Sequence, residues 1–160
     1  MTGTSKPRGA VLPQRASELI RVAIRDLRSI ERSKAYRVDM TLWHSVGSRQ
    51  RSCAVCLGGA VMARTFGADR ESTLVPEDVA ISHWDTARLY ALDSLRLGVV
   101  DHALVDDMGL DAEHVRRRLA RLPAGSLADG YWRVPRYADE PKEFKRSMLA
   151  MADALEGVGL

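Results

Sequence analysis

The sequence is poor in the features that mark secreted and membrane proteins. It contains two cysteines among 160 residues, too few for the disulfide framework of a small secreted domain. It contains no apolar run close to the ~20 residues that a membrane-spanning helix needs, and residues 1–13 lack the apolar core of a secretory signal. We therefore expect a protein of a reducing cytoplasm, without a membrane partner.

Motifs of the common catalytic classes are also absent from the sequence. There is no Gly-x-Ser-x-Gly elbow, and Gly58-Gly59 is not followed by the Gly-Lys-Ser/Thr of a phosphate-binding loop. Paired acids occur at Glu77-Asp78 and Asp106-Asp107, but two-metal chemistry needs acids that converge in space, which spacing does not show. The sequence thus predicts no catalytic residue and leaves open whether the protein is an enzyme.

What is present indicates one mainly α-helical domain. Hydrophobic residues make up 46% of the chain, an ordinary share for a globular protein, and domains cluster at about 100–150 residues. We predict a flexible tail over 1–13 and a single compact helical bundle over 14–160. Apolar positions recur at three- and four-residue steps, with Ser17 as the expected N-cap of the first helix. The predicted helices span 17–34, 53–66, 76–81, 83–97, 99–107, 112–122 and 141–157.

Segment 53–66 is the predicted centre of this bundle. It carries one charged residue, Arg64, and it includes Gly58 and Gly59, which allow a neighbouring helix to approach closely. A helix that is apolar on all sides belongs in the interior of a domain. We therefore expect the other helices to pack around this one.

A short β ribbon is predicted beside the helices. Residues 36–42 alternate apolar and polar side chains, which is the pattern of a half-buried strand. A lone strand needs a partner, and the best candidate elsewhere is 131–134, which is followed by Pro135. The expected ribbon therefore has at most two strands.

Charge is distributed unevenly along the chain, which the formal net charge of +3 conceals. Residues 1–70 hold 13 Lys/Arg against 5 Asp/Glu, a net charge of +8. Residues 71–111 hold 2 against 9, a net charge of −7, and residues 112–160 hold 9 against 7, a net charge of +2. Such segments either neutralise each other within the fold or present patches to a partner, and we favour mutual neutralisation.

Two arginine clusters contain the candidate partner-binding residues. Clusters of this kind attract phosphates in a salt-dependent and largely sequence-blind way, so nucleic acid is one hypothesis for the partner. The first cluster lines one face of the first helix at steps of four, three and four residues, and it consists of Arg21, Arg25, Arg28 and Arg32. The second cluster lies on 112–122 and consists of Arg116, Arg117, Arg118 and Arg121.

The pair Cys53 and Cys56 supports a structural and a chemical interpretation. Free cysteine is among the most buried residue types, so a structural role without any cofactor is the leading interpretation. A thiol at a helix start is favoured as thiolate, which suits redox chemistry. Zinc would need two more ligands, for which His44 is the best candidate. A thiol- or zinc-dependent enzyme centred on Cys53, Cys56 and His44 is therefore an alternative.

One stretch of the chain resembles a known group of proteins. Segment 53–63 (CAVCLGGAVMA), preceded by MTLWH at 40–44, is similar to a stretch of small uncharacterised accessory proteins of tailed phages and prophages. The resemblance implies a phage-encoded protein in the cytoplasm of a bacterial host. Proteins of that kind often bind a host enzyme or nucleic-acid machinery, in host takeover or against host defence. The resemblance assigns no catalytic residue to this chain.

These observations give an ordered set of functional hypotheses. The leading one is a non-enzymatic interaction protein that binds a host macromolecule, with a protein partner ahead of nucleic acid and with self-association as an addition. The first alternative is a nucleic-acid-binding protein that uses the basic helix 17–34 and the second arginine cluster. The thiol- or zinc-dependent enzyme comes third.

Overall fold

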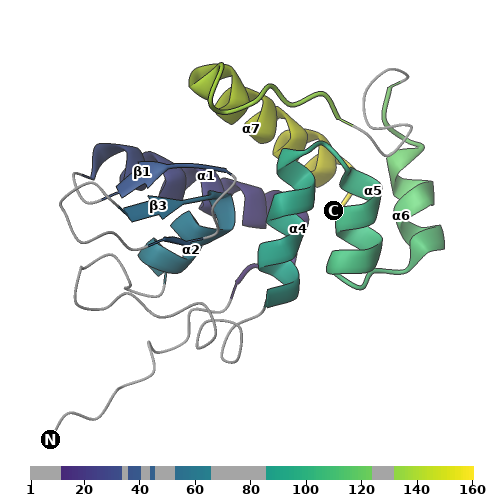
Figure 1. The fold of residues 1–160 in the computed structure, drawn as a ribbon. Coiled ribbons are helices and arrows are strands. Elements are labelled where there is room, and N and C mark those ends of the chain that lie inside the picture. Colours follow the sequence, from purple (N-terminus) through teal and green to yellow (C-terminus); the bar gives the residue numbers. More distant parts are fainter. Residues whose placement is uncertain (1–11, 34–35, 41–43, 46–52, 66–85, 124–131) are drawn as a thin grey trace, which may run out of the picture.

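The computed structural model describes residues 12–33, 36–40, 44–45, 53–65, 86–123 and 132–160. In chain order its elements are α1 (Ala16–Arg32), β1 (Tyr36–Val38), β2 (His44–Ser45), β3 (Cys53–Val55), α2 (Leu57–Thr65), α4 (Thr86–Arg96), α5 (Val100–His102), the π-helical turn η2 (Ala103–Asp107), α6 (Ala112–Leu119) and α7 (Pro141–Gly157). Helices predominate, which confirms the predicted mainly α class. The small sheet and α6 lie at opposite ends of the molecule (Figure 1).

Helix α1 is the element on which the others assemble. Its buried stripe includes Ile20, Ile24, Leu27 and Ile30, as the helical periodicity predicted. Helices α2, α4 and α7 and strand β1 all pack against it. In the segment 53–66, predicted to be the centre of the bundle, Leu57, Ala60 and Val61 of α2 are fully buried in the core, and α2 packs against both α1 and α4.

Helix α1 begins without the cap that the sequence predicted. Arg15 occupies the N-cap position with extended backbone and makes no side-chain cap bond. Ser17 lies inside the first turn and is buried. Its amide donates to the carbonyl oxygen of Leu160 at 3.3 Å, and its hydroxyl donates to the same oxygen at 3.2 Å. The far end of the sequence therefore satisfies a backbone donor that a capping side chain would otherwise satisfy.

The sheet consists of three short strands in the order β1-β3-β2. Strand β1 runs parallel to β3, with Tyr36 opposite Cys53. Strand β2 runs antiparallel to β3, with His44 opposite Val55. The structure thus confirms the predicted strand over its first three residues and adds a strand at 53–55 that the sequence assigned to a helix.

The predicted partner of the first strand was wrong. Segment 131–134 was expected to pair with 36–42, but β3 is the partner that the structure shows. Tyr131 lies outside the described residues, and the Trp132 amide donates to the carbonyl oxygen of Gly98 at 2.7 Å. The error arose because residues 53–66 form one apolar run, in which no change of period marks where a strand ends and a helix begins.

Helices α4 and α6 have the end signals that the sequence predicted. Helix α4 ends at Arg96, and the turn that follows contains Gly98, whose φ is +80°; the Val99 amide donates to the Ser94 carbonyl oxygen at 3.1 Å across this turn. Helix α6 begins at the predicted cap, because Asp111 Oδ2 accepts a hydrogen bond from the His114 amide at 2.8 Å. The predicted helix over 76–81 lies outside the described residues.

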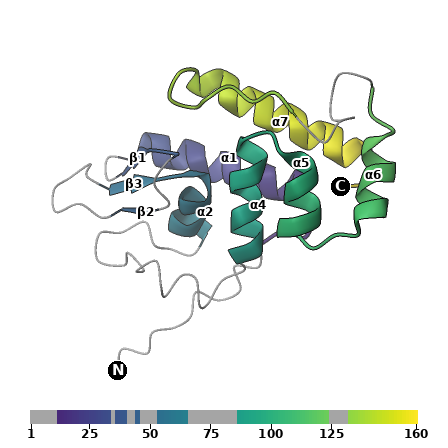
Figure 2. The ribbon, with the colours of Figure 1, turned by 45° about the vertical axis from the view of Figure 1, so that its right-hand side comes forward.

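Helix α7 matches its prediction from Pro141 in the first turn to Gly157. After its last turn, Gly159 has a φ of +82°, and the Leu160 amide donates to the Leu155 carbonyl oxygen at 2.8 Å. Helix α7 lies along α1 (Figure 2). Its buried stripe is the predicted one and consists of Phe144, Met148, Met151, Ala152 and Leu155.

The folded part of the chain includes a residue that the prediction placed in the tail. Leu12 is buried with the core, whereas residues 1–11 lie outside the described part of the chain. None of the described helices combines the length and apolar character that crossing a membrane requires.

Substitution of Gly98 by alanine should strongly destabilise the fold. An added Cβ would lie 1.8 Å from the carbonyl oxygen of Trp132, and the positive φ adds strain for any L side chain. We expect Gly98→Ala to lower the free energy of unfolding by about 3 kcal/mol or more in urea titrations. Gly109→Ala is the matched control, because Gly109 has a φ of +67° but no atom within 4 Å of the added Cβ. That variant should lose only about 1 kcal/mol, and equal losses in the two variants would contradict this account.

Candidate functional site

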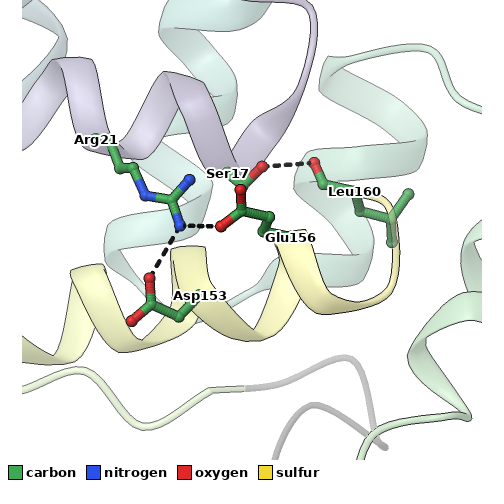
Figure 3. Close-up of polar contacts among 5 residues, drawn as sticks. All are labelled: Ser17, Arg21, Asp153, Glu156 and Leu160. Atoms are coloured by element: carbon green, nitrogen blue, oxygen red, sulfur yellow. Dashed lines mark hydrogen bonds and ion pairs between the residues drawn. The ribbon is translucent and has the colours of Figure 1, made fainter.

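Arg21 forms the most extensive ion-pair contact between α1 and α7. Its Nη2 lies 2.9 Å from Asp153 Oδ1 and 2.6 Å from Glu156 Oε2 (Figure 3). One turn earlier on α1, Ser17 bonds to Leu160, so the two contacts lie side by side along the helix pair. Arg21 was predicted to contact a partner, but its guanidinium is engaged inside the fold.

The acids that neutralise Arg21 belong to α7 and not to the acidic segment 71–111. In the described part of that segment, the acids contact local residues: Asp93 pairs with Arg96 at 2.6 Å, and Asp106 Oδ2 lies 2.7 Å from His102 Nδ1. Residues 71–85 lie outside the described part of the chain. The favoured interpretation, in which the basic and acidic segments neutralise each other, does not hold for Arg21.

The remaining arginines of the stripe, Arg25, Arg28 and Arg32, are exposed. Arg25 is 68% exposed and donates to the neighbouring Asp26 from Nε and Nη2, each at 3.1 Å. The three residues follow each other at one-turn intervals, so they share the side of α1 that faces away from its buried stripe. We call these three residues the arginine face of α1.

The second arginine cluster is divided between the surface and the fold. Arg116 and Arg117 are exposed and pair with Glu113 of their own helix, Arg117 at 3.5 Å. Arg118 is partly buried and donates from Nη1 to the carbonyl oxygen of Val158 at 3.2 Å, which ties α6 to the end of α7. Arg121 is exposed. Three members of the predicted cluster are therefore exposed, whereas Arg118 is bonded within the fold.

The structure separates the two cysteines by element. Cys53 lies in β3 and His44 in the neighbouring strand β2, while Cys56 immediately precedes α2. The side chains of Cys53 and His44 lie outside the described parts, as does Trp43. Among the described residues, no group of three or more His, Cys, Asp or Glu side chains is placed to hold a metal ion.

Cys56, and not Cys53, is the thiol at the helix start. Its Sγ accepts a hydrogen bond from the Gly59 amide at 3.5 Å. Burial raises the pKa of the Cys56 thiol above its ordinary value, although the amides of Gly59 and Gly58 lower it in part. Burial and the raised pKa of Cys56 disfavour its thiolate form, on which redox chemistry and metal binding depend.

A polar cluster that the sequence did not predict lies between α4 and η2. Ser94 Oγ donates to Asp107 Oδ2 at 2.6 Å, while His102 Nδ1 lies 2.7 Å from Asp106 Oδ2 and its Nε2 lies 3.8 Å from Asp107 Oδ1. The sequence signal for the second contact is the four-residue spacing of His102 and Asp106. Because the Ser94 hydroxyl donates to a carboxylate and not to an imidazole, these residues do not form a nucleophile–base pair of the Ser–His type.

Glu31 anchors the last turn of α1 to the start of α7. Lys145 Nζ lies 2.7 Å from Glu31 Oε1, and both side chains are largely covered, at 16% and 22% exposure. The Tyr137 hydroxyl donates to Glu31 Oε2 at 2.7 Å, and the Tyr137 ring packs edge-on against Phe144 at 5.5 Å. Together with Arg21, this cluster sets the register of the antiparallel helix pair.

Comparison with known proteins gives no assignment: no protein-family model matches the chain, and neither a curated protein nor a solved structure matches it.

Replacement of Tyr137 by phenylalanine should weaken the α1–α7 contact. At neutral pH the loss of the hydrogen bond to Glu31 should cost about 1 kcal/mol of unfolding free energy. Burial, and then the carboxylate of Glu31, raise the pKa of Tyr137, so its contribution is complete below the unfolded value of about 10 and is lost as pH rises above it. Urea titrations across this range should show a shallower alkaline loss of stability for Tyr137→Phe. Parallel pH curves for the two proteins would contradict the assignment.

Cys56 should resist alkylation in the folded protein. In a Cys53→Ser variant, Cys56 is the single thiol, so its reaction with iodoacetamide near pH 8 reports on that site alone. We expect the native protein to react at least roughly 100-fold more slowly than the urea-unfolded chain, because the thiol is buried and its raised pKa disfavours the reactive thiolate. Equal rates in the two states would show that Cys56 is an accessible thiolate.

Proposed function

We propose that this protein is a non-enzymatic interaction protein that binds an anionic macromolecule through the arginine face of α1. The observation that carries the proposal is the contrast between Arg21, which α7 neutralises, and the three arginines that follow it on the same helix. Arg28 and Arg32 are exposed, and the exposed side chain of Arg25 also contacts the neighbouring buried Asp26. Helix α7 thus engages Arg21, whereas Arg25, Arg28 and Arg32 lie at the surface.

Stability alone does not account for this surface. Like charges at three- and four-residue spacing repel each other along a helix, and a Glu in place of one of them would convert the repulsion into attraction. The three arginines extend over about 10.5 Å of helix, so their repulsion is concentrated in two turns. An anionic partner would remove it, which is the physical reason to assign the face to binding.

The reactive side chains among the described residues also support a binding role. The Cys56 thiol is buried and has a raised pKa, and the Ser94 hydroxyl is committed to Asp107. The resemblance of segment 53–63 to phage accessory proteins supplies the proposed setting, in which a phage-encoded protein contacts a macromolecule of its bacterial host.

Charge reversal on the arginine face should abolish partner capture. Wild-type protein immobilised on a resin should recover a partner from bacterial lysate, and Arg25→Glu/Arg32→Glu should lose it because both substituted residues are exposed. Arg116→Glu/Arg117→Glu is the matched control, since it makes the same charge change on the exposed side of α6.

Parallel captures from nuclease-treated lysate would distinguish a protein partner from a nucleic acid. Recovery of nothing above background by the wild-type protein would contradict the proposal. Equal retention of the partner by wild type and Arg25→Glu/Arg32→Glu would show that the arginine face is not the contact surface.

A further inference from the structure

The line along which α1 and α7 pack side by side, here called the seam, has a cation facing an acid near one end and cations on both helices further along. Near one end, Arg21 of α1 faces Asp153 of α7 at 2.9 Å. Two turns further along α1, the same side of the helix is occupied by Arg28, since seven residues make nearly two full turns. The helices are antiparallel, so the matching position on α7 lies two turns before Asp153. That position is Arg146, a cation in place of the acid.

The far end of the seam confirms this register. Lys145, which precedes Arg146, contacts Glu31 in the last turn of α1 at 2.7 Å. Lys142 lies one turn before Arg146 on α7, and both side chains are exposed. The outer surface of the helix pair therefore carries cations from both helices around its middle and far end.

From this juxtaposition we infer that α1 and α7 together form a binding surface for the phosphate backbone of a nucleic acid. We call it the basic seam; it consists of Arg25, Arg28 and Arg32 of α1 with Lys142 and Arg146 of α7. The inference rests on the proposed function, because it names the partner class for the arginine face and extends that face onto a second helix.

The local acids reduce the charge of the basic seam without removing it. Arg146 Nη1 lies 2.9 Å from Glu143 Oε1 within α7, and Arg25 contacts Asp26. Glu31 is already bonded to Lys145 and Tyr137. The Arg146–Glu143 pair is exposed and screened by solvent, so a phosphate can displace the Glu143 carboxylate at little cost, whereas Asp26 is buried and keeps its contact with Arg25.

The composition of the basic seam fits a phosphate backbone better than a protein partner. Protein interfaces place apolar and aromatic side chains at their centre and exclude charge from it. Among the described residues, the large hydrophobic side chains with high exposure are Tyr90, in α4, and Leu97, in the turn that follows it, and neither belongs to α1 or α7. Nucleic-acid interfaces are polar and strongly basic. Arg25 and Arg32 are about 10.5 Å apart along the helix, which corresponds to the axial rise of about three base pairs of a duplex at 3.4 Å each.

The arginines of α6 belong to a different part of the surface and provide a matched control. Arg118 joins α6 to Val158 at the C-terminal end of α7, and Figure 2 shows α6 beside that end, away from the start of α7. Asp153 and Glu156 lie between the two regions along α7 and are paired with Arg21. A nucleic acid on the basic seam therefore does not need Arg116 or Arg117.

The test is a fluorescence-anisotropy titration of a labelled DNA duplex of about 20 base pairs at NaCl concentrations from about 50 to about 200 mM. If the basic seam neutralises about four phosphates, a plot of log affinity against log salt should have a slope of roughly −3 to −4. Arg28→Gln/Arg146→Gln should make that slope shallower by about two and weaken binding about tenfold or more at the lowest salt. Arg116→Gln/Arg117→Gln, with the same charge change, should alter affinity by less than about twofold.

Urea unfolding of both double variants separates binding from folding. Arg28→Gln/Arg146→Gln relieves repulsion between two cations but removes the exposed Arg146–Glu143 pair, so its urea midpoint should stay close to that of the wild type. A loss of duplex binding that accompanies unfolding would identify a structural role and overturn the inference.

Other outcomes overturn the inference in distinguishable ways. Absence of duplex binding at about 50 mM NaCl, or equal losses in the two double variants, would reject the basic seam as a nucleic-acid surface. If lysate capture then still recovers a nuclease-resistant partner that Arg25→Glu/Arg32→Glu loses, the proposed function stands with an acidic protein as partner. If capture also fails, both proposals fail.

Discussion

Antiparallel packing of α1 against α7 is the constraint on which the rest of the structure depends. Three polar contacts hold the pair in one register: Ser17 with Leu160, Arg21 with Asp153 and Glu156, and Glu31 with Lys145. Between these contacts lie the buried apolar side chains of both helices. Helices α2 and α4 and strand β1 pack onto α1, while α5 and η2 pack onto α4, α6 packs onto η2, and the rest of the sheet packs onto β1 through β3. The same register brings cations of the two helices together on the outer surface, so the contact that stabilises the fold also creates the basic seam.

The packing of the helices determines which acidic and basic residues of the unevenly charged sequence contact each other. Segment sums suggested that residues 1–70 and 71–111 neutralise each other. The structure instead shows Arg21 paired with acids of α7, and acids of the middle region, such as Asp93 and Asp106, paired with close neighbours in sequence. A net charge summed over a segment says nothing about which residues meet, because contacts depend on helix direction and register.

The sequence predicted a helix correctly where its periodicity or its end residues alone determine the structure. The period of 3.6 residues identified the buried stripes of α1 and α7, and local chemistry identified the Asp111 cap and the Gly98 turn that follows α4. It failed where tertiary contacts decided the outcome. Ser17 was expected to cap α1, but Leu160 from the other end of the sequence bonds to it. Segment 53–55 was expected to be helical, but pairing with β1 makes it a strand. Arg21 and Arg28 look alike in the sequence, and only the position of α7 distinguishes the paired arginine from the exposed one.

The central claim is that the outer surface of the α1–α7 pair is the contact surface of this protein. The most direct measurement is an NMR titration that follows the arginine Nε–Hε resonances of the intact protein as a DNA duplex is added. The account predicts shifts for Arg25, Arg28, Arg32 and Arg146, which lie on the basic seam, and none for Arg116 or Arg117 on α6. Shifts confined to the α6 arginines, or unchanged spectra at low salt, would contradict it.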